Sequence, residues 1–239
     1  MTLRPIFIIL VDISGYTKFI RYHKTSLLHA EKIVAELMEA VLAKVEVPIV
    51  AHEILGDAIS LYAIDEGIPG QPDTIYQQLQ KYFEAFWNRE ASLISACNLC
   101  ECDACRQVGR LKLKAVLHAG EAAFTKVLQA DKISGEDVII AHRLLKNSVP
   151  SNEYILMTDA FVQRCDSLDL TMLVPCIETC DDIGQVQAYY CNLDKTGPPP
   201  LVSLQSKLAD FFRIEGYMIR RWFREGKYQY RNLPLSPVE

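Results

Sequence analysis

Two aspartates stand where a metal–nucleotide site would need them. The segment Phe7–Phe19 is an apolar run that ends at Asp12 and then turns at once through Gly15. The segment Glu53–Tyr62 has the pattern of a hairpin with Gly56-Asp57 at its tip. A strand end and a hairpin tip can bring both carboxylates to one edge of a sheet, where they suit Mg²⁺ or Mn²⁺. The amide groups of the turn after Gly15 suit phosphate.

The elements that must position these side chains alternate between strands and helices. Apolar periodicity first predicts a strand at 5–11, two helices in 15–46 with a break near 23–26, and a hairpin of 48–55 and 58–64. A helix at 73–95 and a hairpin of 110–118 and 121–127 follow. The last predicted elements are a helix from 136 to about 146 and strands at 154–157 and 185–192. In the strand at 110–118, basic and apolar residues alternate, so its basic face is expected in solvent. This order predicts an α+β sandwich, a mainly antiparallel sheet with helices packed on it.

Composition limits the class of protein. The chain has 239 residues, 50% of them hydrophobic, and a net charge of −5, which excludes a non-specific nucleic-acid binder. No apolar run approaches the about 20 residues of a membrane span, and a cytoplasmic protein is expected.

Residues 1–196 are predicted to form one domain, and residues 197–239 a Pro-rich linker and a basic amphipathic helix. That helix suits packing on its own domain or across a dimer, or contact with a partner or an anionic membrane.

Four cysteines lie within nine residues of one another: Cys97, Cys100, Cys102 and Cys105. In a chain without an export signal such a cluster indicates metal more than disulfides. Four thiolates suit tetrahedral Zn²⁺, and a structural zinc site is the interpretation favoured here. A mixed ligand set, thiols without metal, redox-active thiols and an iron–sulfur cluster are the alternatives.

Four motifs in order resemble the class III adenylate/guanylate (nucleotidyl) cyclase catalytic domain. They are Asp12-Ile13-Ser14-Gly15-Tyr16-Thr17, Gly56-Asp57, His118-Ala119-Gly120 and the segment Gly135–Arg143. The resemblance covers about residues 5–193. It indicates a divergent bacterial branch in which the cysteine cluster at about 97–105 is an insertion.

The resemblance implies a fold, a cofactor and an assembly. The fold would be a ferredoxin-like sandwich of the nucleotide cyclase type, and two chains would form a head-to-tail homodimer. Asp12 and Asp57, with the carbonyl group of Ile13, would hold Mg²⁺ or Mn²⁺. The turn residues Gly15, Tyr16 and Thr17 would contact a nucleoside triphosphate.

The catalytic arm departs from the family pattern. Ile139 stands in place of the asparagine that orients the ribose, whereas the catalytic arginine is matched by Arg143. The segment 181–184 lacks the family's phosphate-binding lysine. Each lost donor costs roughly 10²–10³ in rate by analogy with an oxyanion hole.

Glu53 and Lys132 fall where the family reads the base. A carboxylate accepts from guanine N1–H and N2–H, so the pair complements guanine better than adenine; alternatively, the two side chains pair with each other.

The leading function is binding of nucleotide and divalent metal in a signalling or regulatory role. A low-activity cyclase acting on GTP or ATP and a zinc-stabilised protein-interaction module are the alternatives.

Overall fold

The computed structural model describes most of the chain as two compact units. The described residues are 2–22, 24–25, 27–96, 102–128, 130–180, 182–193, 195, 209–210, 212, 216, 223 and 231–232. The first unit comprises Met1–Ser14, Lys44–Tyr82 and Leu113–Asp194, and the second comprises Gly15–Ala43, Phe83–Lys112 and Lys195–Glu239.

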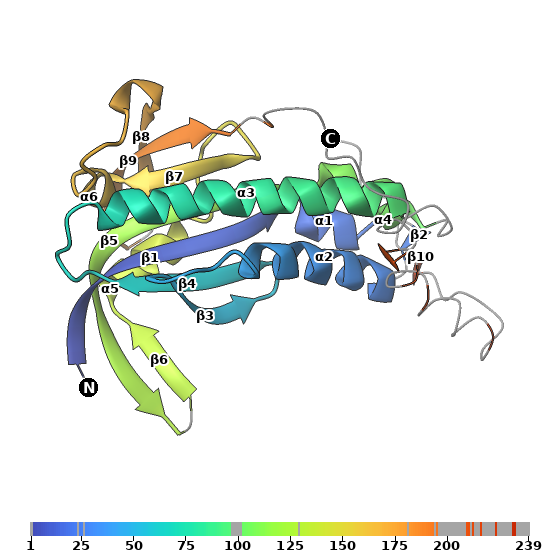
Figure 1. Cartoon of the computed structure of the whole chain (residues 1–239), viewed down its shortest axis with the longest axis horizontal. Coiled ribbons are helices and arrows are strands. Elements are labelled where there is room, and N and C mark those ends of the chain that lie inside the picture. Colours follow the sequence, from blue (N-terminus) through green and yellow to red (C-terminus); the bar gives the residue numbers. More distant parts are fainter. Residues whose placement is uncertain are drawn as a thin grey trace. The chain divides into compact units, whose positions relative to one another are not determined.

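An eight-stranded mixed sheet forms the first unit (Figure 1). Its strands are β1 (Thr2–Ser14), β3 (Val50–Leu55), β4 (Ala58–Ile64), β5 (Lys112–Val127), β6 (Ala130–Ser134), β7 (Tyr154–Thr158), β8 (Val174–Cys180) and β9 (Gly184–Asn192). The order is β3-β4-β1-β5-β7-β9-β8, with β6 paired to β5. The pairings β1–β4, β3–β4, β5–β6, β7–β9 and β8–β9 are antiparallel, and β5–β7 is parallel. The chain is therefore an α+β protein with a mostly antiparallel sheet, as the sequence predicted.

Strand β1 lies inside this sheet between β4 and β5. Residues Ile6–Val11 are all buried, which explains why the strand is a continuous apolar run instead of an alternating one. The first unit also contains the short helices α5 (Glu136–Arg143), α6 (Asp159–Val162) and η2 (Leu170–Met172), and the first turns of α3 (Gln71–Ala96).

The second unit is mainly helical. It contains α1 (Tyr16–Ile20), α2 (Leu27–Leu42), α4 (Asp103–Arg106), η1 (Val108–Arg110), the rest of α3, and the two-stranded pair of β2 (Lys24–Thr25) and β10 (Arg231–Asn232). Apolar residues at helical spacing, such as Ile33 and Leu37, form the buried stripe of α2.

Several predicted elements are corrected. Residues 110–118 and 121–127 are not a hairpin, because β5 runs without interruption from Lys112 to Val127 and its hairpin partner is β6. Gly120 lies within that strand, whereas the predicted strand ended at residue 118. Helix α5 ends at Arg143, a few residues before the predicted end, and β8 was not predicted.

The far end of the inner strand β5 runs on past the neighbouring strands and forms a hairpin with β6 (Figure 1). It pairs Ala123–Val127 with Ala130–Ser134. The predicted hairpin around Gly56-Asp57 is confirmed as β3 and β4.

The predicted C-terminal helix at 201–226 lies mostly outside the described residues, as does the predicted boundary at 196/197. Asp210 is described and is buried; its carboxylate accepts hydrogen bonds from Arg89 Nη1 at 2.7 Å and from the hydroxyl group of Ser92. This part of the tail therefore contacts α3 within its own chain.

Among the described helices, none combines the length and the apolar character that a membrane span requires.

Candidate functional site

Asp12 and Asp57 are brought together by the pairing of β1 with β4. Asp12 lies opposite Ala58, the first residue of β4, so the hairpin tip reaches the end of β1. The amide of Ile13 donates a hydrogen bond to the carbonyl oxygen of Asp57 at 3.2 Å. Gly56 has a φ of +65°, which a glycine adopts without strain, and this turns the chain so that Asp57 follows.

The two carboxyl groups share a hydrogen bond, and burial together with the charge of Asp12 raises the pKa of Asp57 to about 6. The pKa is higher in the folded protein than in the unfolded chain. Protonation of Asp57 therefore favours the folded state; this contribution is complete below about pH 4 and is lost as the pH rises through about 6. A cation bound beside the two carboxyl groups would counter the burial and repulsion that raise the pKa of Asp57.

Lys114 already places one positive charge at this pair. Its Nζ lies 3.0 Å from Asp12 Oδ2 and donates a hydrogen bond to the carbonyl oxygen of Leu145 at 2.8 Å. The Lys114 side chain is 18% exposed and that of Asp12 is 15% exposed. The prediction that the basic face of this strand lies in solvent is therefore wrong at Lys114. The ammonium group neutralises part of the charge that a divalent cation would bind.

A second polar network joins β5 to the start of α5. Hydrogen bonds of 2.9 Å connect His118 Nδ1 with Thr158 Oγ1, and His118 Nε2 with Asp137 Oδ1. Asp137 Oδ2 also accepts from the amide of Glu121 at 2.7 Å. A Cβ on Gly120 would lie 2.1 Å from Asp137 Cγ, so only glycine leaves room for this carboxylate. The His-Ala-Gly motif thus fixes α5 against the sheet.

Helix α5 presents the predicted catalytic-arm positions to a cavity of about 400 Å³. Ile139, His142, Arg143 and Lys146 line it, with Thr179 of β8 opposite. Ile139 is 53% exposed and offers no hydrogen-bonding group there. Lys146 was not singled out in the sequence, although it follows Arg143 at helical spacing.

The segment after α5 is fixed by a buried carboxylate on β8. Glu178 accepts hydrogen bonds from the amide of Ser148 at 3.0 and 3.1 Å and from its hydroxyl group at 2.9 Å. The β8–β9 turn carries exposed Asp182 where the family has its basic segment. The basic groups of this cavity therefore come from α5 and the residues just after it.

Glu53 and Lys132 are both exposed, on β3 and β6. Lys132 lies opposite Thr125 in the β5–β6 hairpin. Among the described residues, no ion pair joins Lys132 to Glu53. The negative charge of Glu53 instead acts on His142, whose pKa is nevertheless lowered because burial dominates.

The remaining predicted site residues belong to the second unit. Gly15 has a φ of +90° and precedes α1, which is only five residues long; Tyr16 and Thr17 begin that helix. Of the four clustered cysteines, Cys102 and Cys105 are described and buried, whereas Cys97 and Cys100 lie outside the described residues. Contact between nucleotide and Gly15–Thr17 stays a prediction.

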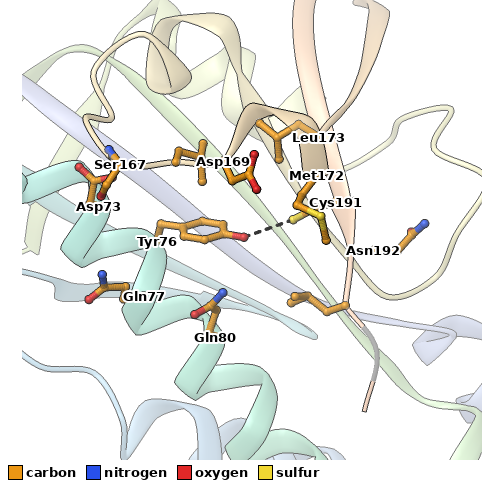
Figure 2. Close-up of a pocket in the computed structure, with 12 residues that line it drawn as sticks. Asp73, Tyr76, Gln77, Gln80, Ser167, Asp169, Met172, Leu173, Cys191 and Asn192 are labelled. Atoms are coloured by element: carbon orange, nitrogen blue, oxygen red, sulfur yellow. Dashed lines mark hydrogen bonds between the residues drawn. The ribbon is translucent and has the colours of Figure 1, made fainter. Parts of the chain in front are cut away.

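A further cavity of about 420 Å³ lies beside α3 in the first unit (Figure 2). Tyr76 points across it and its hydroxyl group lies 3.6 Å from Cys191 Sγ; burial raises the pKa of both groups. Burial would also raise the pKa of Asp73, but hydrogen bonds from the amides of Asp166 and Ser167, each at 3.0 Å, outweigh it and lower this pKa. The carboxylate of Asp73 is therefore used to hold a loop, and Asp169, the other carboxylate that lines this cavity, accepts hydrogen bonds from the amide and the hydroxyl group of Thr171.

A family model described as "Protein of unknown function (DUF2652)" matches residues 34–154. "Uncharacterized protein Rv2561/Rv2562" of Mycobacterium tuberculosis (strain ATCC 25618 / H37Rv) is 38% identical over 103 residues. That match covers 43% of this chain and 49% of the relative, so the chain spans about half the length of this relative.

Solved cyclase structures share the fold. The guanylate cyclase domain of RhGC from Catenaria anguillulae in complex with GTP has a TM-score of 0.57 at 16% identity, covering 82% of this chain and 100% of that domain. A bacterial light-regulated adenylyl cyclase has a TM-score of 0.57 at 14% identity, covering 79% and 90%. A non-canonical dimeric guanylyl cyclase domain of the RhoGC fusion protein from the aquatic fungus Blastocladiella emersonii has a TM-score of 0.52 at 12% identity, covering 80% of this chain and 98% of that domain. The described chain therefore has the fold of the class III cyclase catalytic domain, as the sequence motifs predicted.

Proposed function

The chain belongs to the family described as "Protein of unknown function (DUF2652)", and we propose that it is a catalytically impaired cyclase-homology domain that binds a nucleoside triphosphate with Mg²⁺ or Mn²⁺ in a regulatory role. Two carboxylates at adjacent strand and hairpin ends supply the oxygen ligands that these cations prefer. The backbone carbonyl group of Ile13, the residue directly after Asp12, is the third candidate ligand. The fold supports this proposal, because cyclases of the same fold are solved with GTP.

The contact between Lys114 and Asp12 is the observation that carries the proposal. It supports a site that attracts positive charge and would hold divalent metal weakly, because the ammonium group of Lys114 competes for one of the two carboxylates. Weak metal binding suits a nucleotide sensor better than an enzyme, since turnover needs the metal to activate the ribose hydroxyl and to clamp the phosphates.

The α5 cavity supports impaired turnover. Ile139 cannot orient a ribose, and the β8–β9 turn presents the carboxylate of Asp182 in place of a basic side chain. Arg143 and Lys146 line this cavity and are the two cationic groups that could contact phosphate there. We therefore assign Arg143 to phosphate binding, with stabilisation of a transferring phosphoryl group as its ancestral role.

A low-activity cyclase is the second candidate function. Arg143 and Lys146 line the same cavity, and together they offer charge that a pentavalent phosphorus transition state would need. In both candidates we propose a homodimer, since a dimeric cyclase domain shares the fold. A role as a protein-interaction module alone would require neither metal nor nucleotide.

The relative affinity for GTP and ATP distinguishes a domain that binds nucleotide from one that keeps only the cyclase fold. We expect wild-type protein with Mn²⁺ to bind GTP more tightly than ATP, because Glu53 meets the donor edge of guanine but the N1 acceptor of adenine. Glu53 is exposed in the free chain, so the preference depends on bound nucleotide covering its carboxylate; a polar group left unpaired by such burial costs about 1–3 kcal/mol, which is roughly 5- to 150-fold in affinity. Competition binding with both nucleotides measures the preference, and Glu53→Lys should weaken or reverse it.

Glu66→Lys is the matched control, since Glu66 is also exposed in the first unit and is not part of the proposed site. Equal affinities for GTP and ATP in wild-type protein would show that Glu53 does not read a base. If neither nucleotide binds or raises the melting temperature, the interaction-module alternative is favoured over nucleotide binding.

A further inference from the structure

His29 joins the cysteine segment in the second unit. This histidine lies in the first turn of α2, whereas Cys102 precedes α4 and Cys105 lies within it. His29 Nδ1 is 3.0 Å from Cys105 Sγ, which in turn is 3.0 Å from Cys102 Sγ. All three ligand atoms lie within 4.8 Å of one another.

The three side chains are almost fully buried. His29 is 2% exposed, Cys105 4% and Cys102 0%. Their sulfur–sulfur distance of 3.0 Å is well above the about 2.05 Å of a disulfide, so the two cysteines are not bonded to each other. One imidazole nitrogen and two sulfurs that converge in an interior are the donor set of a structural zinc site.

We propose that His29, Cys102 and Cys105 are three ligands of a structural Zn²⁺ that holds α4 against the first turn of α2. The soft thiolates and the imidazole select zinc over Mg²⁺ or Mn²⁺, which prefer oxygen ligands. Burial of all three described ligands is typical of structural zinc and not of a catalytic centre, which keeps a position for water or substrate. The fourth position belongs to a ligand outside this set; Cys97 and Cys100, predicted from the sequence to bind zinc, lie outside the described residues.

This ion would stabilise the surroundings of the Gly15 turn. The segment that contains Cys102 and Cys105 continues to Arg110, whose carbonyl oxygen would lie 3.2 Å from a Cβ on Gly15. On α2, Glu31 follows His29 by two residues and accepts a hydrogen bond from the hydroxyl group of Tyr16 at 3.0 Å. The zinc would therefore fix two of the segments that support the turn, whether or not the turn binds a nucleotide.

X-ray absorption spectroscopy of the purified, tag-free wild-type protein tests the ligand set directly. We expect one zinc per chain by elemental analysis, with sulfur neighbours at about 2.3 Å and at least one nitrogen neighbour at about 2.0–2.1 Å. A shell of sulfur alone would overturn the assignment of His29 and support the four-cysteine site. Protein that is folded without zinc, or that contains a Cys102–Cys105 disulfide by mass spectrometry, would overturn the zinc site itself.

Variants give a second, independent readout. His29→Gln and Cys105→Ser should each lower the bound zinc at least tenfold after dialysis against a weak chelator, and both should lower the melting temperature. Cys176→Ser is the control, because this half-buried cysteine of β8 lies in the other unit and should leave the zinc content unchanged. If His29→Gln retains the full zinc content of the wild type, His29 is not a ligand.

Discussion

Purified protein given Mn²⁺ with GTP or ATP is expected to form cyclic nucleotide at least about a thousandfold more slowly than a typical enzyme rate of about 10 s⁻¹. Two groups that the class III pattern uses in the transition state are missing from this chain. Ile139 replaces the ribose-orienting amide, and the β8–β9 turn has no lysine for the phosphates. Losses of roughly 10²–10³ for each such group would combine to at least this deficit.

Product analysis by chromatography measures this rate, with an active cyclase assayed in parallel. The Asp12→Asn variant is the control for contaminating activity, since it removes a candidate metal ligand. Turnover within tenfold of the typical rate, abolished by Asp12→Asn, would contradict impairment. It would mean that Lys146, Lys126 or a partner subunit supplies the missing charge.

Replacement of Lys114 by glutamine is expected to raise the affinity for Mn²⁺ by about ten- to a hundredfold. The ammonium group lies 3.0 Å from Asp12 Oδ2 and the two side chains are more than four-fifths buried, so its repulsion of a divalent cation is only partly screened. A coulombic interaction between unit charges 4 Å apart is about 4 kcal/mol at an effective dielectric constant near 20, and partial exposure reduces this to the 1.4–2.8 kcal/mol that the expected change represents. Calorimetric titration with Mn²⁺ measures the difference.

Lys126→Gln is the matched control. Lys126 lies on the same strand and its Nζ is 3.7 Å from Asp131 Oδ1, but its side chain is 76% exposed. Water and salt screen such a pair, so this variant should bind Mn²⁺ as the wild type does. Unchanged or weaker Mn²⁺ binding in Lys114→Gln would show that Lys114 does not compete with metal.

The order of motifs was sufficient to predict the fold and the meeting of Asp12 with Asp57. The Gly-Asp tip fixes the register of β3 with β4, and the apolar run of β1 places the strand inside the sheet. Strand β5 was misjudged because the His-Ala-Gly motif was expected at the end of a strand. In the structure its glycine makes room for Asp137 of α5, and the pattern of residues within the strand does not carry that contact.

Two chemically important side chains were missed for the same reason. Lys114 belongs to an alternating strand and was assigned to solvent, but the neighbouring strand end places Asp12 beside it. His29 lies on the buried stripe of α2, where a histidine is a weak signal, and more than seventy residues separate it from the cysteines that it contacts. Tertiary pairing decides both contacts, whereas periodicity only indicates which residues are buried.

Calorimetric titration of Mn²⁺ at pH 7.5 into wild-type protein and into the Asp12→Asn/Asp57→Asn double variant tests the metal site most directly. The wild type should bind Mn²⁺ weakly and in a saturable way, because two carboxylates converge but Lys114 opposes the metal. The double variant should lose that binding while it stays folded, since each asparagine preserves the shape of the side chain and relieves the repulsion between the carboxylates. Equal affinity for Mn²⁺ in the two proteins would contradict a metal site at Asp12 and Asp57, and with it the proposal that this domain binds metal and nucleotide.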